Sequence, residues 1–389
     1  MRYAFLEEQS TRKALAEFIL TAPRLSMDEQ CRRFEEAFSQ HQGRTYSVFV
    51  NSGASANLIL LQALKNLGRL KTGDKIGFSA LTWSTNTMPI EQLGFVPVPV
   101  DCNPATMNVH SAQLEDRLRQ APDMKAFFAT NVLGFTGDLN NIRQLCEQRG
   151  IIFLEDNCES MGSELPEGKA GNFGLAATFS FFVAHHMSTI EGGMVCTDDP
   201  ELAEMLLIVR ANGWDRNLPA HRQQALRQAH GISSEFKSRY TFYHPAYNVR
   251  PTEITAYLGL LQLQHVASTY LRRQENFQRV EKWVRSNPDF IPFDYSHMKL
   301  LSAFSLSFLC RSEELRDAYV QRFIQNGIEV RPLIAGNMGA QPYYKKYIGT
   351  EYPLPGADTL DRCGFYCGNF PTMTEEDFQL IASSLQPIS

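Results

Sequence analysis

The first two hundred residues alternate between short strand-like runs and helical stretches, and this alternation limits the possible folds more than any other feature. The strand-like runs are Tyr46–Val50, Lys75–Ser79, Val96–Val100, Ala126–Thr130, Ile151–Glu155, Thr178–Val183 and Gly193–Thr197. Helical stretches separate most of them, which is typical of a largely parallel sheet covered by helices on both faces. We expect this α/β domain to span residues 1–250.

The pattern changes after about residue 250. Two helices are expected at Thr252–Val266 and Tyr270–Ser286, followed by strand-like pieces at Phe304–Cys310 and Ile328–Val330 and a last helix from Glu375. This predicts a smaller C-terminal α+β domain over residues 251–389, which is an ordinary domain size.

Two helices flank the first strand. Residues 26–42 form an amphipathic pattern that begins with a capping box from Ser26 to Glu29. A second helix, Asn57–Leu67, follows a turn of small residues.

The composition excludes several classes of protein. A net charge of −5 and a pI near 6.0 give no electrostatic reason to expect a nucleic acid or an anionic membrane as partner. The N-terminus lacks the order of a signal peptide, and no apolar run approaches the ~18 residues that span a bilayer. The 8 cysteines are scattered without a CxxC pair, so no metal site is expected. Reduced thiols fit a cytoplasmic protein.

The turn NSGASAN, Asn51–Asn57, lies between a strand and a helix. Small residues let backbone N–H groups approach an anion, and the helix dipole favours negative charge there by ~0.3–1 kcal/mol. The turn matches neither a P-loop nor GxGxxG, and a plain strand-to-helix connection explains it equally well.

Two further residues follow strands in the same way. Trp83 comes after Lys75–Ser79 and can stack on a flat heteroaromatic ring, although most tryptophans pack in cores. Asp156 follows a hydrophobic strand, at the end that faces the ligand crevice in parallel α/β sheets. Many acids at strand ends are merely solvated or cap a helix.

Taken in chain order, these patterns indicate a pyridoxal-phosphate (PLP) enzyme. The turn would take the phosphate, Trp83 would stack on the pyridine ring, and Asp156 would keep the ring nitrogen protonated so that the ring acts as an electron sink. Ser180 and then Glu191-Gly-Gly follow in the corresponding order.

The sequence resembles the nucleotide-sugar aminotransferase family, whose members are fold type I PLP proteins. The resemblance runs over nearly the whole chain, through the segments RRFEEAFSQHQG, NSGASANL, LEDNCES, GNFG, TFSFF, EGG, YNVRP, GIEVRP and YCGNFP. It implies an aspartate-aminotransferase-like, three-layer α/β/α large domain, a smaller α+β domain, and a homodimer with a shared active site.

The lysine that binds the cofactor in this family is missing here. The family pattern is F-S-F, three residues, lysine, five residues and E-G-G, and counting from Phe179 or back from Glu191 places the lysine position at His185. The nearest upstream lysine is Lys169. Histidine has no primary amine to bond to the cofactor aldehyde, but a pKa of about 6.5 suits a base at neutral pH. We expect His185 to be the catalytic base, with His186 as the alternative.

A base without the lysine suits an enzyme that works from the pyridoxamine form of the cofactor (PMP). The sequence resembles the 3-dehydratase branch of the family, which implies loss of the 3-hydroxyl group of a nucleotide-linked 4-keto-6-deoxyhexose. GDP-linked 4-keto-6-deoxymannose is the expected substrate, as in the colitose pathway. L-glutamate would regenerate PMP, and the product would serve a cell-surface glycan such as the O-antigen of lipopolysaccharide.

The resemblance also implies roles for individual residues. Gly53, Ala54 and Ser180 would bind the phosphate, and Asn248 would reach the phosphate bound to the partner subunit. Asp156 and Glu159 would contact the ring on which Trp83 stacks. Aminotransferases usually carry glutamine at the position of Glu159, so this glutamate also favours the dehydratase branch.

Two differences from the family and two alternatives remain. The family commonly has His-Gly where this chain has Asn212–Gly213. Residues 214–245 contain no cysteine, so the iron–sulfur cluster of the other 3-dehydratase branch is not expected. The alternatives are a sugar aminotransferase that uses His185 and a non-catalytic protein that binds the cofactor or the sugar.

Overall fold

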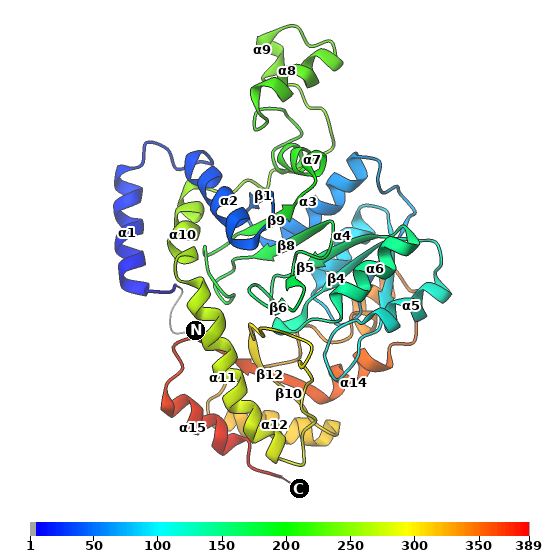
Figure 1. The fold of residues 1–389 in the computed structure, drawn as a ribbon, viewed down its shortest axis with the longest axis vertical. Coiled ribbons are helices and arrows are strands. Elements are labelled where there is room, and N and C mark those ends of the chain that lie inside the picture. Colours follow the sequence, from blue (N-terminus) through cyan, green and yellow to red (C-terminus); the bar gives the residue numbers. More distant parts are fainter. Residues whose placement is uncertain (1–4, 389) are drawn as a thin grey trace. The chain divides into compact units, whose positions relative to one another are not determined.

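The structure is a computed structural model that describes residues 5–388. Apolar residues dominate the strand-like runs, and every one of these runs forms a strand (Figure 1). Four strands have the predicted bounds: β1 (Tyr46–Val50), β2 (Lys75–Ser79), β3 (Val96–Val100) and β9 (Gly193–Thr197). Three are shifted: β4 (Met124–Thr130), β5 (Ile152–Asp156) and β8 (Ala176–Ser180). The prediction that the last of these continues to Val183 was wrong, because its partner strand β9 begins opposite Ser180.

The described residues belong to two compact units. One contains residues 5–74, 92–95 and 175–264, and the other contains residues 75–91, 96–174 and 265–388. The predicted domain boundary near residue 250 stays a prediction.

The first unit contains three strands in the order β1-β9-β8, with β9 antiparallel to both neighbours. Its core is aromatic: Phe34 packs edge-on against Phe49 at a centroid distance of 4.9 Å, and Phe38 contacts Phe179 and Phe181 at 5.1 and 5.2 Å. Its helices are α1 (Glu8–Thr21), α2 (Glu29–Gln42), α3 (Gly53–Asn66), α7 (Pro200–Arg210), α8 (Ala220–Ala229), α9 (Glu235–Ser238) and α10 (Glu253–Leu263). Helix α10 lies between α1 and α2 (Figure 1).

The predicted capping box of the second helix was wrong, because a residue distant in sequence caps this helix. Helix α2 begins at Glu29, and the carboxylate of Glu253 accepts the backbone N–H groups of Asp28, Gln30 and Cys31 at 2.7, 2.8 and 3.1 Å. Glu253 is buried. Its negative charge also suits the positive end of the helix dipole.

Replacing Glu253 with glutamine is expected to destabilise the protein by about 2 kcal/mol. Glutamine has one acceptor oxygen and no charge, so at least one buried N–H group at the start of α2 loses its partner, which costs about 1–3 kcal/mol. Urea unfolding followed by circular dichroism measures the change. Glu36→Gln, at an exposed position on the same helix, is the control. Equal midpoints for the two variants would contradict this account.

The second unit contains four parallel strands in the order β5-β4-β2-β3. The short strands β6 (Glu164–Leu165) and β7 (Gly168–Lys169) follow β5. Helical elements connect the parallel strands: α4 (Ser84–Gln92), α5 (Ser111–Gln120), η1 (Val132–Gly134) and α6 (Leu139–Arg149). Parallel strands need such crossover connections, so the predicted alternation is explained.

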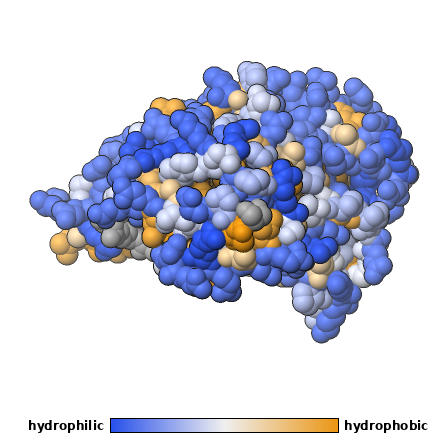
Figure 2. Space-filling model, turned by 90° about the horizontal axis from the view of Figure 1, so that it is seen from below, coloured by the Kyte–Doolittle hydropathy of each residue, from blue (hydrophilic) through white to orange (hydrophobic). Residues whose placement is uncertain are grey.

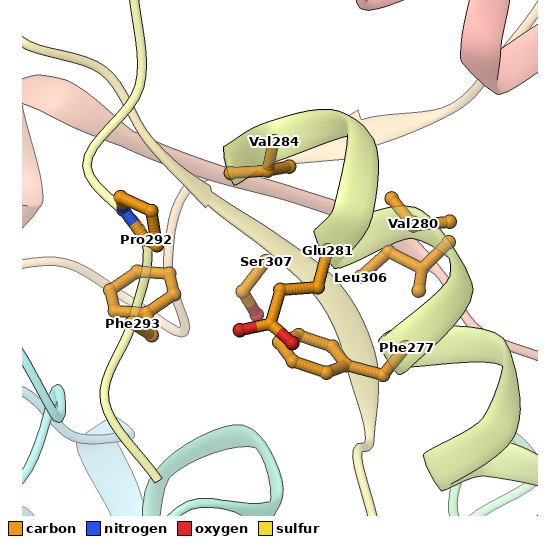
Figure 3. Close-up of a pocket in the computed structure, with 8 residues that line it drawn as sticks. All are labelled: Phe277, Val280, Glu281, Val284, Pro292, Phe293, Leu306 and Ser307. Atoms are coloured by element: carbon orange, nitrogen blue, oxygen red, sulfur yellow. The ribbon is translucent and has the colours of Figure 1, made fainter. Parts of the chain in front are cut away.

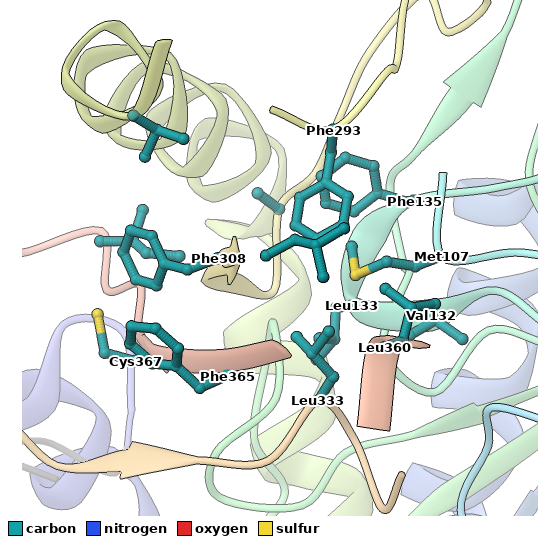
Figure 4. Packing of buried hydrophobic residues seen from close by; sticks show 14 of the residues in the cluster. Met107, Val132, Leu133, Phe135, Phe293, Phe308, Leu333, Leu360, Phe365 and Cys367 are labelled. Carbon is teal, nitrogen blue, oxygen red and sulfur yellow. The ribbon is translucent and has the colours of Figure 1, made fainter. Parts of the chain in front are cut away.

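The same unit has a second, antiparallel sheet of three strands in the order β10-β12-β11. The sequence analysis missed its central strand β12 (Gly364–Gly368), because GFYCG carries two glycines that weaken the strand pattern. The remaining elements are α11 (Val266–Ser286), β10 (Ser305–Leu309), α12 (Glu313–Gln325), β11 (Val330–Arg331), η2 (Met338–Ala340), α13 (Pro342–Tyr347), α14 (Pro355–Cys363) and α15 (Glu375–Ser384). Figure 4 shows the core between this sheet and the turn at Leu133.

The surface is mixed in character. In Figure 2 the visible face is mostly hydrophilic, with apolar side chains in small separate groups. Across residues 5–388, none of the helices combines the length and the apolar character that crossing a membrane requires.

Candidate active site

The predicted phosphate turn is the first turn of a helix. Helix α3 begins at Gly53, four residues before the predicted start, because Ser52 caps it: the Ser52 Oγ accepts the N–H of Ser55 at 3.1 Å. The first helical hydrogen bond runs from the Ala56 N–H to the Ser52 carbonyl. The N–H groups of Gly53 and Ala54 therefore precede the helical bonding pattern, which is the arrangement that binds anions at helix N-termini.

Ser180 lies at the same edge of the sheet as this turn. Gly193, the first residue of β9, pairs with Val50 at the end of β1 on one side and with Ser180 at the end of β8 on the other. A Cβ atom on Gly193 would lie 2.2 Å from the Ser52 carbonyl oxygen. The second glycine of Glu-Gly-Gly is thus required for the turn to approach the strand this closely.

The segment between β8 and β9 carries the two histidines. His185 is partly buried, and its Nδ1 lies 3.3 Å from the carbonyl oxygen of Ser180. An Nδ1–H that donates to this carbonyl leaves the lone pair on Nε2, the tautomer of a base. His186 is only 2% exposed. The two neighbours therefore differ in access to solvent, and the geometry favours His185 over His186 as the base.

Asn248 lies beside the phosphate turn of its own chain. The N–H of Asn51 donates to the carbonyl of Val249 at 3.1 Å, and Asn248 itself forms a β-bridge with Ala211. Its side chain is exposed and accepts a hydrogen bond from the Arg250 Nε at 2.9 Å. A role toward a partner subunit stays a prediction.

Trp83, Asp156 and Glu159 belong to the second unit. Trp83 is 53% exposed, so this tryptophan does not pack in the core. Asp156 ends β5 and is 4% exposed; it accepts the Asn86 Nδ2 at 2.7 Å and the Cys158 N–H at 2.9 Å. These two donors orient the carboxylate at the end of the strand.

The acid that precedes Asp156 has a structural task. Glu155 is fully buried and accepts the backbone N–H groups of Gly171, Phe173 and Gly174, each at 2.8 Å. These hydrogen bonds hold the GNFG segment in place. Successive strand residues point to opposite faces, so only one of two adjacent acids can face a ligand.

Glu159 is held at a strained turn. Its Oε2 accepts the backbone N–H of Leu133 at 3.1 Å, and Leu133 adopts a left-handed conformation with φ 54°. Burial, with a smaller contribution from the charge of Asp156, raises the pKa of Glu159 to about 8, although the Leu133 N–H acts in the opposite direction. Ile190 and Ile334 are also left-handed, at φ 71° and 48°. Such strain in large apolar residues is often found at ligand sites.

The raised pKa of Glu159 predicts a pH dependence of stability. The folded protein keeps its proton up to about pH 8, whereas the unfolded chain releases it near 4.5, so this group's contribution to stability falls as pH rises between these values. Glutamine does not titrate, so the Glu159→Gln variant should lack this loss. We expect the free energy of unfolding of the variant to rise relative to that of the wild type from pH 5 to pH 8. Urea unfolding of the cofactor-free proteins measures it, and a constant difference would contradict the raised pKa.

The sequence analysis missed Asn86, which orients Asp156 from α4, and Leu133, which binds Glu159. Neither residue type carries a pattern that marks it, because both roles depend on contacts between distant segments.

Figure 3 shows a separate pocket between α11 and β10, where Glu281 and Ser307 lie among apolar side chains. Its cavity of about 10 Å³ holds at most one water, so it is a packing gap. Among residues 5–388, His, Cys, Asp and Glu form no group of three that could hold a metal ion.

Comparisons with known proteins agree over nearly the whole chain. The DegT/DnrJ/EryC1/StrS aminotransferase family matches residues 7–386. GDP-4-keto-6-deoxy-D-mannose 3-dehydratase from Yersinia pseudotuberculosis is 34% identical over 357 residues, which cover 90% of this chain and 89% of that protein.

Solved structures show the same fold. The Escherichia coli GDP-4-keto-6-deoxy-D-mannose-3-dehydratase with bound hydrated PLP is 31% identical, with a TM-score of 0.89 over 97% of both chains. A GDP-4-keto-6-deoxymannose-3-dehydratase with a trapped PLP-glutamate geminal diamine has a TM-score of 0.87 at 31% identity, covering 97% of this chain and 97% of that one. The predicted aminotransferase-like α/β fold is confirmed.

Proposed function

Because this chain belongs to the DegT/DnrJ/EryC1/StrS aminotransferase family, we propose that it is a PLP/PMP-dependent dehydratase of a nucleotide-linked 4-keto-6-deoxyhexose. The enzyme removes the 3-hydroxyl group of GDP-4-keto-6-deoxymannose and yields the 4-keto-3,6-dideoxy sugar. The observation that carries the proposal is His185 at the position of the family's lysine, held by the carbonyl of Ser180. The 3-dehydratases that resemble the chain over 90% and 97% of its length support it.

The residues present fit the cofactor. The N–H groups of Gly53 and Ala54 at the start of α3, together with Ser180 at the same sheet edge, would hold the phosphate. The exposed ring of Trp83 would stack on the pyridine, Asp156 would bind its protonated nitrogen, and Glu159 would contact the ring. When bound, the cofactor supplies an electron sink and an amine that is exchanged with L-glutamate.

His185 performs the proton transfer. Its Nε2 would accept a proton from the bound cofactor, and the Ser180 carbonyl would stabilise the resulting imidazolium through Nδ1–H. A histidine cannot attach to the cofactor as a lysine does, so the residue acts on protons alone.

Three parts of the proposal concern assembly and location. We propose a homodimer in which the exposed Asn248 reaches the phosphate of the partner subunit. We also propose a smaller C-terminal domain from residue 251. The cytoplasm is the proposed location, since the 8 cysteines are free thiols of the kind found in reducing compartments.

Mass spectrometry of the sugar product tests the function. The purified protein is incubated with PLP, L-glutamate and GDP-4-keto-6-deoxymannose. A product that has lost one water and is still a ketone would support the dehydratase. An amino sugar would show that the protein is an aminotransferase, and unchanged substrate would overturn the proposed substrate.

A further inference from the structure

The turn that follows β5 carries three side chains that bind the segment after β4. The Oε2 of Glu159 accepts the backbone N–H of Leu133 at 3.1 Å, and the Oγ of Ser160 accepts the N–H of the next residue, Gly134, also at 3.1 Å. The Oγ of Ser163 donates to the carbonyl of Gly134 at 2.6 Å. Both serines are fully buried. Two consecutive acceptors thus meet two consecutive N–H groups.

Ser160 also joins the two ends of the bound segment. Its hydroxyl donates to the carbonyl of Asn131 at 2.6 Å while it accepts the N–H of Gly134. Between these two residues lies Leu133, whose backbone is left-handed at φ 54°. A large apolar residue keeps this conformation only where its surroundings hold it. The side chain of Leu133 is fully buried in the core shown in Figure 4, and the hydroxyl of Ser160 keeps the backbone from relaxing.

The carboxyl of Glu159 depends on this backbone for its orientation. Within residues 5–388, the Leu133 N–H is the one hydrogen-bond donor that reaches the Glu159 carboxyl, and it holds Oε2. The last torsion of a glutamate side chain has only a broad preference, so a fixed donor is needed to set the plane of the carboxyl. With Oε2 bound to the protein, Oε1 is the oxygen that can meet a ligand.

We propose that Ser160 is a positioning residue for Glu159: its hydroxyl keeps the Leu133 N–H aimed at Oε2, so that Oε1 is presented to the cofactor ring. This inference rests on the proposed function, in which Glu159 contacts the ring. Ser160 itself touches neither cofactor nor substrate and acts only through Leu133 and Glu159. The carboxyl is thereby oriented before the cofactor arrives, which reduces the ordering that binding requires.

The first test uses the protein without cofactor. Burial raises the pKa of Glu159 to about 8, and the Leu133 N–H limits this rise. In Ser160→Ala the N–H should turn away, so the pKa of Glu159 should rise further. Stability falls with pH until the folded pKa is passed, so the loss due to Glu159 should continue above pH 8 in the variant and level off there in the wild type. Urea unfolding of each protein with and without Glu159→Gln, from pH 5 to pH 9, isolates this loss, because the other titrating groups cancel in the cycle.

The second test adds PLP and follows its absorbance. The half-saturating PLP concentration of Ser160→Ala should rise about 2- to 10-fold, as expected for loss of one hydrogen bond. Ser160→Cys has a thiol that is a weaker donor and acceptor, so it should show smaller shifts of the same kind, and it supplies the measurement if Ser160→Ala does not fold.

Ser39→Ala is the matched control. Ser39 belongs to the first unit, is also buried and is hydrogen-bonded to another serine, Ser47, at 2.8 Å. Its replacement should lower the unfolding midpoint, because a buried hydrogen bond is lost. The titration of Glu159 and the half-saturating PLP concentration should stay as in the wild type.

The possible failures are distinguishable. If either the Glu159 titration or the PLP half-saturation is unchanged in Ser160→Ala, the positioning role is overturned and the dehydratase is left intact. Shifts of equal size in Ser39→Ala would also overturn it, because they would reflect a general loss of stability. Wild-type protein whose Glu159 titrates as expected but which dehydrates no sugar from PMP would overturn the proposed function instead.

Discussion

Replacing His185 with asparagine is expected to lower the dehydration rate by a factor of about 10²–10⁴, the usual contribution of a general base. Asparagine is similar in size and its amide can still donate to the Ser180 carbonyl, so the segment should keep its conformation. It has no group that takes a proton at neutral pH. Single-turnover mass spectrometry with PMP-loaded protein measures the loss, and the cofactor absorbance should show that the variant still binds PLP.

His186→Asn is the control, since the two histidines are neighbours with opposite surroundings. His186 is buried, so its replacement should lower the unfolding midpoint. The rate per folded molecule should stay within a few-fold of the wild type. If His186→Asn abolished dehydration and His185→Asn did not, the assignment of the base would be reversed.

Replacing Asp156 with asparagine is expected to have the second largest effect. In the proposed function, the carboxylate would stabilise a positive charge on the ring nitrogen from a buried position, where an electrostatic contact is strong because little water screens it. Loss of one preorganised electrostatic partner costs about 10²–10³ in rate. The turnover rate should therefore fall by this factor, and the PLP concentration that half-saturates the protein should rise.

Glu155→Gln is the matched control for Asp156→Asn, because the two acids are adjacent and both are buried. Glu155 holds the N–H groups of the GNFG segment, so its loss should lower the unfolding midpoint. Turnover per folded molecule should change much less than in Asp156→Asn. A loss of turnover in Glu155→Gln alone would show that the wrong acid was assigned to the ring.

The strands were predictable from the sequence because their cause is local. A run such as YSVFV is rich in the β-branched and aromatic residues that are enriched in strands, and β1 has the predicted bounds. The central strand β12 was missed because GFYCG has little preference of its own. It is a strand because β10 and β11 pair with it on both sides.

Helix starts were less predictable, since a cap can come from anywhere in the chain. Ser26 and Glu29 have the spacing of a capping box, yet Glu253 takes the N–H groups at the start of α2. Helix α3 starts early because Ser52 caps it locally, and a sequence reading that treats Ser52 as a cap would have found this start.

The candidate site shows the same division. The sequence by itself determined that a histidine replaces the family's lysine, because this depends only on counting from Phe179 and Glu191. Tertiary structure decided the tautomer that the Ser180 carbonyl favours and which of two adjacent acids caps the GNFG segment. It also raises the pKa of Glu159 to about 8, because folding buries the carboxyl group. Residue identity follows from the chain alone, whereas burial and hydrogen-bond partners come from segments that only folding brings together.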